Sequence, residues 1–256
     1  MTIFQFKKVK LVNLSKNVPL DLFFVEHLKE TGQRSFHFGI GVFCIILITF
    51  LNINIVTKFL QLSTSNIKFF QLSPGDYLVV TLKTSFFLGL INSSPLFVEQ
   101  LILFLFPSFT VNEFRLIKYL ILSVTILFLA GLVFAYFILI PTALGFFFNY
   151  SNNILEPFLS FNQYIEFISL LFFTTGLLFQ LPIVQALLAL FSILSPKKML
   201  KLWKWIIIAS TIVSAIVTPS ADPFTQLLLS LILLLLYAFG VLISFYIVEN
   251  KSLFND

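Results

Sequence analysis

Residues 170–191 read LLFFTTGLLFQLPIVQALLALF, an apolar run long enough to cross a lipid bilayer. About 20 such residues are enough for a transmembrane helix. Gln180, Pro182 and Gln185 lie near the middle of this run, where no water satisfies polar groups. The stretch therefore predicts a membrane helix whose polar positions need a reason, structural or functional.

The composition extends the membrane prediction to the whole chain. Of its 256 residues, 59% are hydrophobic and 11% are charged, whereas soluble domains carry about 25% charged residues. We expect an all-α polytopic membrane protein with six transmembrane helices. The predicted spans are residues 36–56, 77–105, 119–141, 161–191, 204–218 and 223–247.

The basic residues are distributed unequally between the two sides of this topology. Six spans place both termini on one side, and thirteen basic residues fall there: Lys7, Lys8, Lys10, Lys16, Lys29, Arg34, Arg115, Lys118, Lys197, Lys198, Lys201, Lys204 and Lys251. The opposite side has Lys58 and Lys68. The positive-inside rule therefore places both termini on the cytoplasmic side or its organellar equivalent, the stroma. The same excess explains the net charge of +5 without nucleic acid as a partner.

Three regions follow from this pattern. Residues 1–35 form a basic N-terminal segment with an amphipathic interfacial helix, since apolar residues recur there at helical spacing. Residues 36–247 form the six-helix domain, and residues 248–256 form a short polar tail. The N-terminus has no apolar h-region with a cleavage site, so no signal peptide is predicted. Cys44 is the only cysteine, which excludes an intrachain disulfide.

Several polar residues near the helix ends have structural explanations. Glu30 and Arg34 are i,i+4 neighbours that suit a surface ion pair. Glu113 fits a capping box that begins at Thr110, and Asp222 before Pro223 fits a helix N-cap. These structural explanations do not exclude a second, functional role.

Polar residues inside the predicted spans are functional suspects by default. Lys83 and Glu99 are sixteen residues apart in the second span, about 24 Å along a helix, so they do not pair with each other. Snorkelling toward opposite interfaces is the simpler interpretation of both. Gln180 can hydrogen-bond to another helix as structural glue, or it can meet a helix that enters from outside.

Six segments of the chain resemble one protein family in order and separation. They are EHLKETGQR (26–34), QLSPGDYLVVTLKTSFFLG (71–89), LFPSFTVNEFR (105–115), FAYFILIP (134–141), FQLPIV (179–184) and TPSADPFTQ (218–226). Together they resemble TatC, the core subunit of the twin-arginine protein translocase, most closely its plastid-encoded members. The resemblance covers about residues 24–246.

The resemblance implies a glove-shaped bundle of six helices that acts as a receptor and not as an enzyme. Such a receptor binds the twin-arginine signal peptides of folded precursors and gathers single-span TatA- and TatB-type partners, together with other copies of itself. Transport uses the proton-motive force, and no cofactor, metal or catalytic centre is expected. The implied location is the plastid thylakoid membrane, or otherwise the bacterial inner membrane or another organellar membrane.

The resemblance also assigns roles to individual residues. It places signal-peptide recognition on Glu30 and Glu113, with His27 and Leu28 as part of the same motif, because carboxylates accept bidentate hydrogen bonds from guanidinium groups. Partner docking in the membrane falls on Gln180 and Pro182 beside the short fifth span. The loop on the opposite side of the membrane contributes Thr218, Pro219, Asp222 and Gln226.

Two departures from the family's sequence pattern limit the residue roles that the resemblance implies for this chain. Thr31 and Gly32 stand where the family usually has Leu-Arg, so contacts of that arginine do not carry over. Gln180 stands where bacterial members often carry Glu, and an amide does not titrate.

The main alternative function is that of a small-molecule or ion transporter with Gln180, Gln185 and Glu99 at a midplane site. An intramembrane enzyme has little support, since His27 and His37 are the only histidines.

Overall fold

The computed structural model describes residues 20–62, 69–70, 75–105, 114–151, 159–218 and 223–253. These residues are helical apart from short turns and one pair of two-residue strands. The prediction of an all-α chain is thus confirmed except for this pair. Strand β1 (Phe69–Phe70) runs parallel to β2 (Leu159–Ser160), with Phe69 opposite Leu159.

The first predicted span is bent. Helix α1 (Leu20–Leu51) and helix α2 (Ile53–Leu62) meet at Asn52 with a bend of 75°. The side-chain amide of Asn52 donates to the carbonyl oxygen of Ile48 at 2.9 Å, a local bond that competes with helix continuation. The span predicted over residues 36–56 is therefore interrupted at Asn52 and not a straight helix. Helix α1 is continuous through residue 35, where the sequence predicts a domain boundary.

The next two predicted spans form a helical hairpin. Helix α3 (Asp76–Leu105) contains Pro95, and α4 (Phe114–Phe134) continues through the π-helical turn η3 (Ala135–Leu139) into α5 (Ile140–Ser151). The backbone N–H of Ile140 donates to the carbonyl oxygen of Ala135, five residues back. Pro141 explains this wider turn, because proline has no N–H and its ring clashes with the carbonyl four residues earlier.

The remaining elements form the second half of the bundle. They are α6 (Phe161–Leu178), α7 (Leu181–Leu190), α8 (Pro196–Lys201), α9 (Trp203–Val217) and α10 (Pro223–Leu253). Ser195 occupies the N-cap position before Pro196, the first residue of α8, as the Ser-Pro pair favours. The turn after α7 places Ser192 at a φ of 58°, in the left-handed region that favours glycine.

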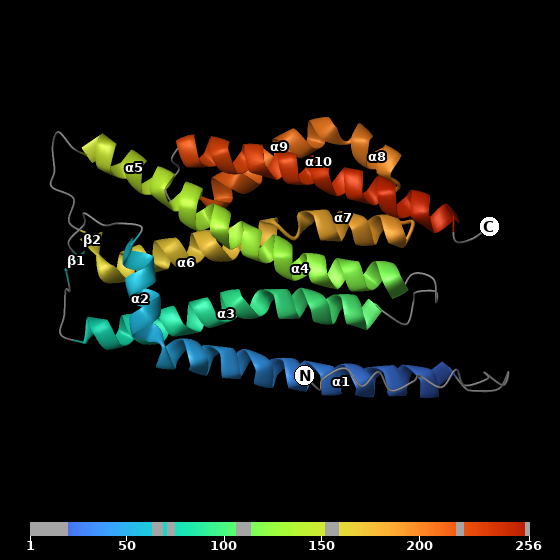
Figure 1. Cartoon of the computed structure of the whole chain (residues 1–256), viewed down its shortest axis with the longest axis horizontal. Helices are drawn as coiled ribbons and strands as arrows, with labels where there is room; N and C mark the ends of the chain where they lie inside the picture. The colour runs from blue at the N-terminus through green and yellow to red at the C-terminus, as the bar shows by residue number, and fades with distance from the viewer. Residues whose placement is uncertain are drawn as a thin grey trace.

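The long helices run side by side (Figure 1), with α6 at the centre. Helix α3 packs against α1, α4 and α6, and α10 packs against α7 and α9. Tyr164, Ile165, Ile168 and Leu171 of α6 are each at most 2% exposed and belong to the main apolar core. The start of α1, the end of α3, the start of α4 and the end of α10 lie at the same end of the bundle (Figure 1).

Length and composition identify the helices that suit a membrane. Three candidate spans qualify among the described residues: Tyr119–Phe147, Phe161–Leu190 and Pro223–Glu249. A fourth results if the bent pair α1–α2 is one span. Helix α9 is apolar but has only 15 residues. Helix α3 is long enough but carries Lys83, Glu99 and several hydroxyl residues, and it lies outside this set.

Candidate functional site

The break between α6 and α7 positions Gln180 inside the bundle. Helix α6 ends at Leu178, and α7 resumes with Pro182 in its first turn, where the missing N–H of proline costs no hydrogen bond. The carbonyl oxygen of Gln180 accepts from the backbone N–H groups of Ile183 and Val184 at 3.0 and 3.1 Å. Pro182 thus ends one helix and starts the next beside a buried amide.

The side chain of Gln180 joins this break to α4. It is 5% exposed, and its Nε2 donates to the carbonyl oxygen of Val124 at 3.2 Å. The expected hydrogen bond to another helix is therefore confirmed. Its Oε1 is buried and has no hydrogen-bond partner among the described residues. An orphaned acceptor in a low-dielectric interior costs free energy, so this oxygen is a candidate contact for a group that arrives from outside.

The residue next to Val124 links α4 to α3. The hydroxyl of Thr125 donates to Oε1 of Glu99 at 3.0 Å, and both side chains are partly buried. Ile102, Val124 and Ile183 form a small apolar cluster where α3, α4 and α7 meet. We call Glu99, Thr125, Val124 and Gln180 the polar junction. It consists of two interhelical hydrogen bonds, Thr125 to Glu99 and Gln180 to Val124, which involve adjacent residues of α4.

A second buried amide lies on α7. Gln185 is 4% exposed, and within the described part of the chain neither its Oε1 nor its Nε2 has a hydrogen-bond partner. It packs against Gly240 of α10, where an added Cβ would overlap Gln185 Oε1 and lie 2.8 Å from the Cα of Pro182. Only glycine allows the two helices this approach. Gln185 thus lies in the α7–α10 contact.

Part of the predicted loop site lies at the end of α9 and the start of α10. Thr218 is 4% exposed, and its hydroxyl donates to the carbonyl oxygen of Ser214 at 2.9 Å. Gln226 on α10 donates through Nε2 to the carbonyl oxygen of Thr211 at 3.5 Å, a long contact between the two helices. Pro219 and Asp222, predicted with them, lie outside the described residues.

The residues predicted to recognise a signal peptide are described only in part. His27, Leu28 and Glu30 lie on α1, whose backbone is helical there, but their side chains lie outside the described part of the chain. Glu113 also lies outside it and directly precedes Phe114, the first residue of α4. The start of α1 and the start of α4 are at the same end of the bundle (Figure 1).

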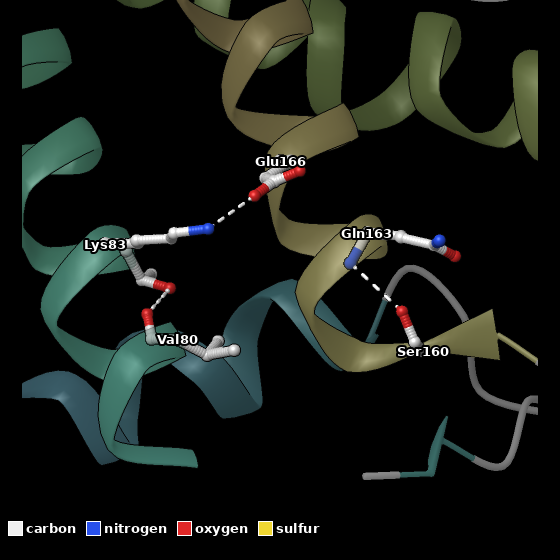
Figure 2. A network of polar contacts seen from close by, with 6 residues as sticks. Val80, Lys83, Ser160, Gln163 and Glu166 are labelled. Atoms are coloured by element: carbon white, nitrogen blue, oxygen red, sulfur yellow. Dashed lines mark hydrogen bonds and ion pairs between the residues drawn. The ribbon is translucent and has the colours of Figure 1, made fainter. Parts of the chain in front are cut away.

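Sequence reasoning missed an ion pair between distant segments. Nζ of Lys83 on α3 lies 2.8 Å from Oε1 of Glu166 on α6 (Figure 2), and the two side chains are 41% and 47% exposed. The snorkelling prediction for Lys83 did not include this partner. Three residues before Gln163, the hydroxyl of Ser160 caps α6 (Figure 2). The 83-residue separation left no local signal for the pair.

Two tyrosines hold α2 against the bundle. The hydroxyl of Tyr164 donates to the carbonyl oxygen of Leu60 at 2.7 Å, and that of Tyr136 donates to the carbonyl oxygen of Phe59 at 3.1 Å. These bonds satisfy carbonyls in the last turn of α2, where helical partners are missing. The ring of Tyr136 also stacks on Phe59 with centroids 4.5 Å apart.

Comparison with known proteins identifies the family. Residues 26–231 match the model of the family described as "Sec-independent protein translocase protein (TatC)". The "Uncharacterized tatC-like protein ycf43" of Trieres chinensis is 50% identical over 234 residues, 91% of this chain and 89% of that protein. The "Sec-independent protein translocase protein TATC, chloroplastic" of Pisum sativum is 39% identical over 217 residues, 84% of this chain and 62% of that protein.

A solved structure gives the same answer for the fold. A crystal structure described as "Twin Arginine Translocase Receptor- TatC in DDM" is 29% identical, with a TM-score of 0.74. The likeness covers 85% of this chain and 99% of that one. These similarities decide against the small-molecule transporter. The chain is an integral membrane protein that belongs to the TatC family, a component of the Sec-independent protein translocase.

Proposed function

We propose that this chain is the receptor subunit of the translocase, which binds the twin-arginine signal peptides of folded precursors. The observation that carries the proposal is its likeness along most of its length to a crystal structure described as a twin-arginine translocase receptor. The chloroplast relative supports the plastid thylakoid membrane as the location. The proton-motive force drives transport in this proposal, without nucleotide hydrolysis.

The proposed topology has six spans in a glove-shaped bundle, with both termini on the stromal or cytoplasmic side. The start of α1 and the end of α10 share one end of the bundle (Figure 1), which supports this arrangement. Lys197, Lys198 and Lys201 of α8 are exposed near the same end. A cluster of cations beside the termini fits the retained side of the membrane.

The proposed signal-peptide site is on that side, at Glu30 and Glu113, with His27 and Leu28 of the same motif. Two carboxylates suit a pair of guanidinium groups, because each accepts two parallel hydrogen bonds. A lysine ammonium offers no such fork, so this site predicts discrimination between Arg-Arg and Lys-Lys signals.

The proposed partner sites lie along the second half of the bundle. Helix α9 has 15 residues, about 22 Å, which is shorter than the roughly 30 Å hydrocarbon core. Its outer face exposes Ile208, Ile212 and Ile216. We assign docking of TatA- and TatB-type helices to this face, to Gln180 and Pro182, and to the loop residues Thr218, Pro219, Asp222 and Gln226. Other copies of the chain complete the assembly.

A transport assay tests the proposal as a whole. Membranes that lack their own TatC-type subunit, but retain TatA- and TatB-type proteins, are supplied with this chain. A folded precursor with an Arg-Arg signal should then enter protected compartments, and a protonophore should stop it. Co-purification of the single-span partners with the chain reports assembly separately. Transport that continues without the chain would contradict the proposal.

A further inference from the structure

Glu99 of α3 and Glu166 of α6 have different surroundings. Glu166 pairs with Lys83 at 2.8 Å. Glu99 has no cation within 4 Å among the described residues, and its hydrogen-bond partner there is Thr125. An ionisable group inside a membrane helix is costly and usually serves a function. Glu99 is therefore a carboxyl group whose charge no cation balances among the described residues.

The carboxylate of Glu99 is partly accessible, whereas the side-chain oxygen of Gln180 is buried. Thr125 occupies one carboxyl oxygen, Oε1, and the side chain is only partly buried. Gln180, which bonds α4 at Val124, is 5% exposed, and its Oε1 has no partner in the described segments. The polar junction thus has unused acceptor capacity at the Glu99 carboxylate and at Oε1 of Gln180, while the second N–H of Gln180 Nε2 is buried with its side chain. A ligand that completes it must bring hydrogen-bond donors.

The surroundings restrict the ligand further. The exposed large side chains nearest to Glu99 and Thr125 along α3 and α4 are apolar: Phe97, Leu122 and Ile126. A polypeptide at this depth must be helical, because its own backbone groups need partners. The fitting ligand is an apolar helical segment that carries a hydroxyl or an amide on one face.

The position of Glu99 along α3 indicates which apolar helical segment could reach it. It lies six residues before Leu105, the end of α3, or about 9 Å along the helix. The connection from α3 to α4 contains Glu113, one of the two proposed arginine-binding residues. A peptide held there by its arginines extends its following apolar residues along this part of the bundle.

We propose that Glu99, supported by the polar junction, accepts a hydrogen bond from a polar residue in the apolar segment of a bound signal peptide. This inference rests on the proposed function, since the arginines bring the segment to the site. Glu99 contacts the peptide, while Thr125 and Gln180 are positioning residues that orient the carboxylate and α4. The contact selects for a donor inside an otherwise apolar segment.

Photo-crosslinking with two probes separates this inference from the proposed function. One probe stands beside the arginine pair of a model precursor and reports binding at the outer site. The other stands in the apolar segment and reports contact with the polar junction. The precursors carry either Asn or Leu at one position of that segment. Asn and Leu have similar size, and Leu is the more favourable of the two in a membrane.

Glu99→Leu in the full chain should lower cross-linking of the Asn precursor from the inner probe by about 3- to 30-fold, the range expected for one membrane hydrogen bond. Cross-linking of the Leu precursor should not fall. Glu99→Gln keeps an acceptor and should preserve both signals. Ser123→Ala is the matched control, since that hydroxyl bonds only within α4, to the carbonyl oxygen of Tyr119 at 2.8 Å.

Equal effects of Glu99→Leu on the Asn and Leu precursors, or no effect on either, would overturn the inference. A scan of Asn through four successive positions with the unaltered protein gives an independent answer if Glu99→Leu fails to fold. A maximum on one helical face supports the contact, and a flat profile contradicts it. If the outer probe does not distinguish Arg-Arg from Lys-Lys precursors, the proposed function fails instead.

Discussion

The amide nitrogen of Gln180 lies 3.2 Å from the carbonyl oxygen of Val124, and this contact ties the α6–α7 break to α4. The oxygen of the same amide is buried, and no described residue bonds to it. The fold thus gains one weak interhelical bond and retains one unsatisfied acceptor. Stability alone does not favour this arrangement, because the two effects oppose each other.

Gln180→Leu is therefore expected to separate stability from function. Leucine removes a bond worth about 0.6–2 kcal/mol and also removes the orphaned acceptor, so stability should change by less than about 1 kcal/mol. Cross-linking to single-span partners and transport should fall. Thermal unfolding in detergent and a transport assay measure the two effects. Normal transport and partner contact in Gln180→Leu would show that Gln180 only packs.

Lys83 and Glu166 provide a test of an ion pair that is open to solvent or headgroups. Because both side chains are more than 40% exposed, the pair should contribute at most about 1 kcal/mol. Lys83→Met and Glu166→Gln should each destabilise slightly, and the double variant should lose less than the sum of the two. The free energies of unfolding of the unaltered protein, the two single variants and the double variant give the coupling energy of the pair. A coupling of several kcal/mol would instead indicate a pair shielded within the membrane.

Gly240→Ala should weaken the α7–α10 contact. The new methyl group would overlap Gln185 and lie 2.8 Å from the backbone of Pro182, so the loss should be about 1–3 kcal/mol. Gly39→Ala is the matched control, because nothing lies within 4 Å of its added Cβ. It should stabilise α1 by about 0.5–1 kcal/mol. Equal melting temperatures for both variants would rule out the close approach.

Ser192→Gly should stabilise the turn after α7. A serine at a φ of 58° carries a steric cost of about 1–2 kcal/mol that glycine avoids. Glycine also raises the entropy of the unfolded chain, so the net gain should be below about 1 kcal/mol. Thermal unfolding measures it, with Ser123→Ala as a control of similar size change. A lower melting temperature for Ser192→Gly would mean that the turn relies on the serine side chain.

The sequence predicts the long helices well because membrane insertion requires long apolar runs. The predicted segment 77–105 differs from α3 by one residue, and 161–191 covers α6 and α7 together. Local side-chain chemistry accounts for the errors. The bend at Asn52 depends on one amide that bonds its own helix, and hydropathy does not record such a bond. The π-helical turn depends on how the chain accommodates Pro141.

The candidate site was predictable only in part, because its contacts join segments that are far apart in the sequence. Gln180 is conspicuous in the sequence because an amide in an apolar run needs a partner. Its partner is a backbone carbonyl, which carries no sequence signal, so α4 was not identifiable as the neighbour. The contact of Glu99 with Thr125 and that of Lys83 with Glu166 also join distant segments. Such pairs follow from the packing and not from spacing along the chain.

Glu30 and Glu113 are the residues proposed to bind the arginine pair of a signal peptide. The most direct measurement is cross-linking of the full chain in membranes to a precursor with Arg-Arg and to its Lys-Lys variant. Arg-Arg should cross-link strongly and Lys-Lys weakly, and Glu30→Ala with Glu113→Ala should abolish the difference. Glu249→Ala, which removes an exposed acid at the end of α10, should leave it intact. Equal binding of both precursors, or unchanged discrimination in the double variant, would contradict the claim.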